Sequence, residues 1–302
     1  MTSPTARPTD PVDFVLPPTS ANDSHPPTSS APNKAQNLTT RAARLRDRLG
    51  DRDLGVLGSL RQFRLLSGHH IQRLHVADGS EKTRARRSRA LVQRLAKLGL
   101  VVRFGRSVGG IRAGSKGHTI GLTGLGEAVL DVGQDQGRRH RQVWEGKPYF
   151  QDHTLAIAEL HTSLTEHIAA NGDADLIAFE TEPKVWRRFG GIGGSLTLKP
   201  DYLAHIGVGD IERVVFVEID LGTESLPSVL RKCQVYLQYW QAGIEQHLHG
   251  LFPSVLWLVP DGRRRGRLQE GVERLPRDAQ ALFTIALLHE GAQLLTTNGG
   301  LA

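Results

Sequence analysis

The order of apolar patterns along the chain limits its fold most strongly. From about residue 40 to 130, three segments with helical spacing precede two short strands and another helix. From about residue 150, the order is a helix, three strands, a helix and a fourth strand, with 283–288 as a fifth strand. The second of these strands is expected over 196–206. The first order is typical of a winged helix-turn-helix, and the second of a sheet with helices on its faces. We therefore predict an α+β multidomain chain with an N-terminal winged helix-turn-helix and a C-terminal α/β domain.

Composition and length place the boundaries between these parts. The chain has 302 residues, which favours two domains. Residues 1–37 are rich in Pro, Ser and Thr and carry almost no apolar pattern, so we expect a disordered tail there. We expect the winged helix-turn-helix domain over 38–135, a linker over 136–152 and the α/β domain over 153–302.

The net charge of +7 is unevenly distributed. Residues 38–118 carry 19 basic and 5 acidic side chains, whereas residues 151–302 carry 13 basic and 19 acidic ones. A strongly basic block beside a mildly acidic block predicts a polyanionic partner for the first block only. We expect that partner to be double-stranded DNA.

The number of cysteines and the lengths of the apolar runs exclude several other classes of protein. Cys233 is the single cysteine, so neither an intrachain disulfide nor a zinc site made of several thiolates can form. No apolar run reaches the ~18 residues that a membrane helix needs, and the N-terminus lacks the apolar stretch of a secretory signal. We therefore expect a cytoplasmic protein with no membrane partner.

A basic helix is predicted from about residue 80 to 98. Leu91, Leu95 and Leu98 share one face of it, and the opposite face is cationic. A helix packed through its leucines would present that ridge to the major groove of DNA. The alternative is an ordinary solvated face, although such faces normally mix charge signs. The residues predicted to bind DNA are Lys82, Arg84, Arg86, Arg87, Arg89, Gln93 and Lys97 on the helix, and Arg103, Arg112 and Lys116 on the following hairpin.

Carboxylates gather at predicted strand ends in the second half. Asp201 follows Pro200, and Glu218 and Asp220 lie two residues apart, so both point to one face of the strand end. Glu159 lies on the preceding helix. Carboxylates that converge in this way suit Mg²⁺ or Mn²⁺, which can activate water against a phosphodiester. The alternative is that these acids are simply the polar ends of buried strands.

Another cationic group follows the fourth predicted strand. Arg263, Arg264, Arg265 and Arg267 form a basic loop that either contacts the DNA backbone near the carboxylates or is a solvated turn.

Residues from about 50 to 290 resemble the replication-relaxation proteins of plasmids and other mobile elements. The resemblance rests on the N-terminal pattern together with three short motifs. These are His153-Thr154-Leu155, Lys199-Pro200-Asp201 and residues 217–224 (VEIDLGTE), followed by a helix that carries Lys232 and Tyr236. It implies a role in plasmid replication or maintenance.

The second half also resembles the PD-(D/E)xK nuclease fold, which implies a restriction-endonuclease-like α/β domain. By this resemblance, Asp201 and Glu218 are the metal carboxylates and Glu159 is the helix glutamate. Asp220 stands where the pattern expects lysine and could instead be a third metal ligand. Lys232 on the following helix is the natural replacement for that lysine, and Lys199 is a weaker one. The catalytic set implied is Asp201, Glu218, Asp220, Lys232 and Glu159, with Asp201, Glu218 and Asp220 as metal ligands.

Two functions remain open at this point. One is a DNA-binding protein of plasmid replication whose C-terminal domain cleaves DNA with Mg²⁺ or Mn²⁺. The other is a non-catalytic DNA-binding regulator or replication accessory with a degenerate nuclease domain. A third, weaker interpretation makes the α/β domain a docking platform for a replication initiator protein, and a homodimer is a further possibility.

Overall fold

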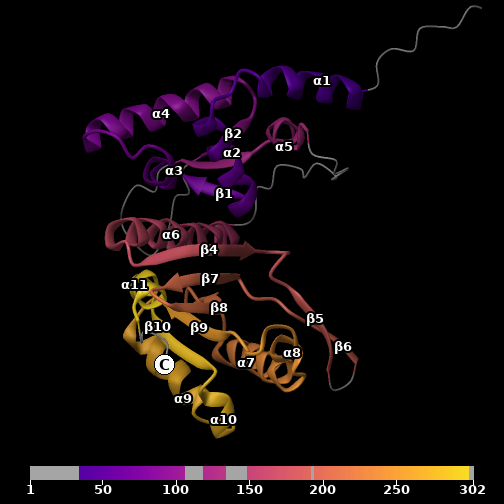
Figure 1. The fold of residues 1–302 in the computed structure, drawn as a ribbon, viewed down its shortest axis with the longest axis vertical. Coiled ribbons are helices and arrows are strands. Elements are labelled where there is room, and N and C mark those ends of the chain that lie inside the picture. Colours follow the sequence, from indigo (N-terminus) through magenta and orange to yellow (C-terminus); the bar gives the residue numbers. More distant parts are fainter. Residues whose placement is uncertain (1–33, 106–117, 134–147, 192–193, 299–302) are drawn as a thin grey trace, which may run out of the picture.

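The computed structural model describes residues 34–105, 118–133, 148–191 and 194–298, and the chain is mixed α+β (Figure 1). Its elements form an N-terminal group and a C-terminal group, with one long helix lying between them. None of the described helices has both the length and the apolar composition that crossing a membrane requires.

The N-terminal group is a helical cluster with a small antiparallel sheet of order β1-β3-β2. Leu57, Leu60, Ile71 and Leu95 are fully buried in its core. Ser67 caps α3 as its sequence position predicts, because its hydroxyl accepts a hydrogen bond from the His70 amide at 3.0 Å. The elements are α1 (Lys34–Arg46), α2 (Asp51–Phe63), β1 (Leu65–Ser67), α3 (Gly68–His75), α4 (Glu81–Lys97), β2 (Val101–Phe104), β3 (Thr119–Leu122) and α5 (Gly124–Asp131).

Helix α1 differs from the expectation for the N-terminal tail. It begins at Lys34, so the last four residues of the expected disordered segment 1–37 are helical. The helix was missed because few of its residues are apolar. It is held by Ala42 and Leu45, which are buried in the same core as Ala128 and Val129 of α5. Residues 1–33 lie outside the described part of the chain.

The C-terminal group is built on a five-stranded sheet of order β10-β9-β8-β7-β4. Strands β4, β7 and β8 pair antiparallel, and β8, β9 and β10 pair parallel. The elements are α6 (Pro148–Asn171), β4 (Ala174–Thr181), β5 (Arg187–Gly191), β6 (Gly194–Leu198), β7 (Tyr202–Val208), β8 (Ile211–Ile219), α7 (Leu226–Gln241), α8 (Ile244–His249), β9 (Ser254–Val259), α9 (Gly262–Val272), α10 (Arg277–Gln280), β10 (Phe283–Leu287), a 3₁₀ turn (Leu288–Glu290) and α11 (Gly291–Thr296).

Two boundaries differ from those expected in this half. The single strand expected over 196–206 is divided, with β6 in a separate hairpin and β7 in the main sheet. Pro200 lies at the break and has no N–H to donate to a ladder, which explains why one strand cannot continue through it. Helix α6 begins at Pro148, so residues 148–152 of the expected linker are helical.

Helices cover both faces of the five-stranded sheet. Leu160 and Leu164 of α6 pack with Leu295 of α11 on one face. Val229 and Cys233 of α7 belong to the core on the other face. The thiol of Cys233 is buried, in agreement with the packed position predicted for it.

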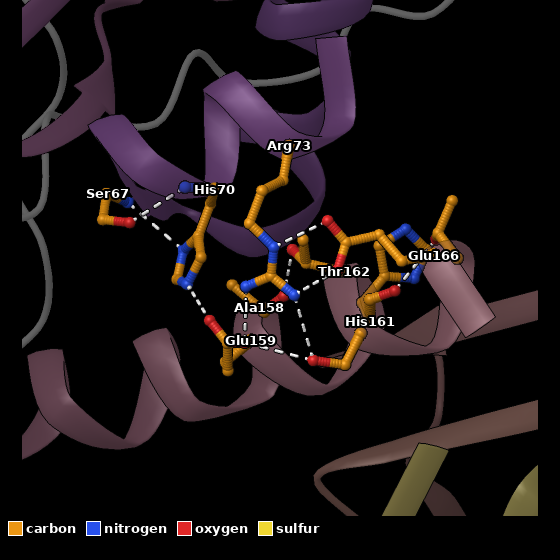
Figure 2. Close-up of polar contacts among 10 residues, drawn as sticks. Ser67, His70, Arg73, Ala158, Glu159, His161, Thr162 and Glu166 are labelled. Atoms are coloured by element: carbon orange, nitrogen blue, oxygen red, sulfur yellow. Dashed lines mark hydrogen bonds and ion pairs between the residues drawn. The ribbon is translucent and has the colours of Figure 1, made fainter. Parts of the chain in front are cut away.

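The two groups meet along α6, where α3 lies across it (Figure 2). Arg73 of α3 donates to both oxygens of Glu166, at 2.8 and 2.5 Å, and to Glu159 at 2.5 Å. The other oxygen of Glu159 lies 3.0 Å from Nε2 of His70. The side chain of Arg73 is only 15% exposed, so its charge depends on these carboxylates for compensation.

An aromatic row continues the junction toward the sheet. The rings of Phe63 and His161 are 4.8 Å apart, those of His161 and Phe179 are 4.5 Å apart, and Phe179 stacks on Tyr202 at 4.5 Å. Burial lowers the pKa of His161 to about 4, so this ring is neutral at pH 7 and packs between the rings of Phe63 and Phe179. The N-terminal group is therefore packed against the sheet and not only tethered to it.

We predict that Arg73→Met lowers the free energy of unfolding by about 2 kcal/mol, because it leaves Glu159 and Glu166 without their shared cation. The value lies between those typical of surface and buried ion pairs, since both carboxylates are about half exposed. Urea unfolding followed by circular dichroism measures it. Arg274→Met, at an exposed arginine beyond α9, is the matched control. Equal midpoints for the two variants would contradict the prediction.

Candidate functional site

A cavity of about 720 Å³ is lined by both groups of elements. The end of α2 contributes Phe63, and the first turns of α6 contribute His153. The remaining wall comes from the sheet and from α7. It includes Glu182, Asp201, Glu218, Lys232 and Trp257.

Asp201 is held just before β7 by donors from two directions. One oxygen accepts the backbone N–H of Ile219 at 2.7 Å, and the other lies 3.1 Å from Nε2 of His153. Although burial opposes ionisation, the charge of Lys232 and the bond from His153 keep the pKa of Asp201 below its usual value. Burial likewise disfavours charge on His153, yet Asp201 holds the pKa of His153 above its usual value. The two groups therefore stabilise each other's charged forms.

Glu218 lies at the end of β8 and is 1% exposed. The hydroxyl of Tyr236 donates to one oxygen at 2.6 Å, and Nζ of Lys232 contacts the other. Burial and the nearby charge of Asp201 outweigh the attraction of Lys232 and raise the pKa of Glu218 to about 8. This carboxyl can therefore hold or release a proton near neutral pH.

Lys232 links the two carboxyl groups. Its ammonium contacts Glu218 and lies 4.0 Å from Asp201. Burial disfavours the charge, but Glu218 and Asp201 together hold the pKa of Lys232 above its usual value. The structure thus brings Asp201, Glu218 and Lys232 to one point, as the resemblance to the nuclease fold implied.

Asp220 lies beside this group but is committed elsewhere. Nε of Arg264 donates to one of its oxygens at 2.6 Å, and the backbone N–H of Gly222 donates to the other at 2.8 Å. Arg264 also donates to the carbonyl of Glu224 at 2.9 Å. Asp220 is therefore an anchor of the β8–α7 connection, and its role as a third metal ligand stays a prediction. The arginines expected to form a basic loop lie in α9, and Arg264 is buried.

Glu159 is not part of the cavity. It faces α3 and pairs with Arg73 and His70 (Figure 2). Although burial favours its protonated form, His70 and Arg73 lower the pKa of Glu159 to about 2. The helix glutamate implied by the nuclease resemblance therefore contributes to the junction of the two groups. His153, six residues earlier on α6, lies near Asp201 instead.

The surroundings of the carboxyl oxygens decide whether Asp201 and Glu218 could hold Mg²⁺ or Mn²⁺. Each oxygen of Asp201 and Glu218 already has a protein donor, and the ammonium of Lys232 fills the position on which they converge. Among the described residues, no group of three or more His, Cys, Asp or Glu side chains is arranged to hold a metal ion. In this arrangement the residues do not fit a resident divalent cation.

The cationic face of α4 forms a second candidate surface. Ser88, Leu91, Val92 and Leu95 are buried against the N-terminal core. Arg84 is half-buried and pairs with Glu81 at 2.5 Å, so it is already compensated. Arg103 is exposed on β2, whereas Arg106, Arg112 and Lys116 lie outside the described residues. The exposed residues of the face are Lys82, Arg86, Arg87, Arg89, Gln93 and Lys97.

Two residues that contact the buried carboxyl groups, Tyr236 at Glu218 and His153 at Asp201, have no role assigned from the sequence. Tyr236 lies four residues after Lys232, so both side chains extend from one face of α7. That spacing in the sequence indicates that the two side chains lie close together. His153 belongs to a motif that carries the family resemblance. Its bond to Asp201 joins residues 48 positions apart, and no local pattern indicates such a contact.

Comparison with known proteins adds one match. Residues 57–255 match the family model described as replication-relaxation, a range that contains both α4 and the Asp201–Glu218–Lys232 group. No curated protein and no solved structure matches the chain.

We predict that Glu218→Gln flattens the pH dependence of stability. Between pH 4.5, the ordinary pKa, and about 8, the unfolded chain ionises Glu218 while the folded chain keeps the proton. This group therefore makes the protein less stable as the pH rises through that window, by up to a few kcal/mol. Urea unfolding at intervals from pH 5 to 8 measures the slope.

Glu270→Gln, at an exposed carboxyl on α9, is the control and should leave the slope unchanged. If the Glu218→Gln variant and the unmodified protein show the same dependence of stability on pH, the prediction is wrong. Glu218 would then have the same pKa in the folded and the unfolded chain.

Proposed function

Because the chain belongs to the replication-relaxation family, we propose that it acts in the replication or maintenance of a plasmid or other mobile element by binding double-stranded DNA through α4. The observation that carries this proposal is the outward face of α4. Five cations and Gln93 are exposed there, while the opposite face is buried.

The charges on this face are held by a rigid support. The hydroxyl of Ser88 donates to the carbonyl of Gly68 at 3.3 Å, which ties α4 to α3. Glu81, the one acid on the helix, is occupied by Arg84 and by Gln72 at 2.6 Å. The face therefore presents one sign of charge. The major groove admits a single helix, and arginine and glutamine can bond to guanine and adenine edges there.

The connectivity of the N-terminal group supports the same proposal. The order α2-β1-α3-α4-β2-β3 is that of a winged helix-turn-helix, with α4 in the position of the recognition helix. In this arrangement Arg103 on β2 faces the phosphate backbone beside the groove. Phosphate contacts set the register of the helix, and base contacts give the specificity.

We predict that Arg86→Ala combined with Arg89→Ala weakens duplex binding by about tenfold or more. The slope of log K against log salt concentration should fall by about 2, because two phosphate contacts are lost. Fluorescence anisotropy with a labelled duplex at several salt concentrations measures both quantities.

Arg274→Ala combined with Arg277→Ala removes the same charge at exposed positions around α10 and is the matched control. Identical slopes for the two double variants would reject α4 as the docking helix.

A second candidate function is hydrolytic cleavage of DNA at the cavity. The observation in its favour is the convergence of Asp201, Glu218 and Lys232 at the ends of neighbouring strands. The order α6-β4-β7-β8-α7-β9 is also the order that we expect for a restriction-endonuclease-like domain. A divalent cation would compete with Lys232 for the same position. DNA binding without cleavage is therefore the better supported function.

We therefore expect supercoiled plasmid to remain supercoiled when it is incubated with the protein and Mg²⁺ or Mn²⁺, under conditions in which anisotropy shows binding. Agarose gel electrophoresis measures the outcome. Nicked or linear product that disappears with Asp201→Ala would replace the binding-only function with the cleavage function. Product that persists in that variant would indicate a contaminating nuclease.

A further inference from the structure

The hairpin of β5 and β6 extends from the sheet as a two-stranded ribbon (Figure 1). Its register places Arg187 opposite Leu198 and Phe189 opposite Leu196, so these residues share one face. That face packs inward. Phe189 and Leu198 are buried in the core that contains α7, and Arg187 donates to Glu245 at 2.8 Å. The cation on the inner face is therefore compensated.

The outer face of the ribbon has a different composition. It carries Arg188 opposite Thr197, with Ser195 and Lys199 on the same side of β6 and its continuation. Nζ of Lys199 lies 4.7 Å from the ring centroid of Trp186. Trp186 itself is partly buried against the core that contains α7. We call the four other residues the ribbon face: Arg188, Ser195, Thr197 and Lys199.

The ribbon face is cationic without opposing charge of its own. The stretch 183–200 contains four basic residues and no acidic one, although it lies in the acidic half of the chain. Arg188 and Lys199 are exposed, and within the described residues neither has an ion-pair partner. Two uncompensated cations beside two hydroxyls form a surface suited to the phosphates of a nucleic acid.

The base of the ribbon lies at the cavity. Thr181 and Glu182, which precede β5, line the cavity wall, and Asp201, which follows β6, belongs to the buried carboxyl group. Lys199 is two residues from Asp201. A strand held along the ribbon face would therefore run toward the cavity.

We propose that the ribbon face binds the phosphate backbone of a nucleic-acid strand and directs that strand toward the cavity of Asp201, Glu218 and Lys232. Arg188 and Lys199 pair with phosphates, and Ser195 and Thr197 donate hydrogen bonds. This proposal rests on the proposed DNA-binding function and adds a second contact surface, located in the other half of the chain from α4.

The test uses the full chain with Arg188→Gln combined with Lys199→Gln. We expect about tenfold weaker binding of DNA and a shallower salt dependence, because two phosphate contacts are lost. Anisotropy with a labelled duplex and with a labelled single strand forms the two arms. A loss confined to the single strand identifies a separated strand as the ligand, and a loss with the duplex identifies the duplex backbone. Either result supports the proposal.

The Arg274→Ala and Arg277→Ala double variant is the matched control here also, and urea unfolding checks that each variant folds. Affinities and slopes equal to those of the control, in both arms, would overturn the ribbon proposal. If Arg86→Ala with Arg89→Ala still weakens duplex binding in that case, the proposed function stands. If the unmodified protein binds neither the duplex nor the single strand, the proposed DNA-binding function is wrong, and the ribbon proposal is wrong with it.

Discussion

Arg73 fixes the relation between the two groups of elements. Its guanidinium lies over α6 and is compensated by Glu159 and Glu166, which lie about two turns apart on one face of that helix. The other side of α6 packs through Leu160 and Leu164 against the sheet. The cationic face of α4 and the cavity therefore belong to one packed structure, because α3 carries α4 and α6 carries His153.

The acids and the cations at the cavity are stabilised by neighbouring side chains and backbone amides. Asp201 depends on the amide of Ile219 and on His153, and Glu218 depends on Tyr236 and Lys232. Removing charges from water is unfavourable unless each finds a partner, and here each has found one. The same compensation explains why the group does not leave a position for a divalent cation. Lys232 supplies the positive charge that Asp201 requires, and that Glu218 requires once it loses its proton.

Much of this arrangement follows from local sequence patterns. Leucine spacing gives the buried face of α4, and Ser67, Ser80, Thr123 and Ser225 each cap a helix. Asp201 and Glu218 meet because acids at the ends of paired strands must lie near one another. The partners of Asp220 and Glu159 could not be predicted. Arg264 lies 44 residues from Asp220, and Arg73 lies 86 residues from Glu159, so packing alone brings these pairs together. Helix α1 was missed for a related reason, since two buried side chains hold an otherwise polar segment.

The interval between His153 and Glu159 is fixed by helix geometry. One residue inserted between them would turn the two side chains relative to each other by about 100° and shift them by about 1.5 Å. His153 would then leave Asp201, or Glu159 would leave Arg73. Among natural relatives, this stretch of α6 should therefore tolerate exchange of residues far more readily than any change in their number.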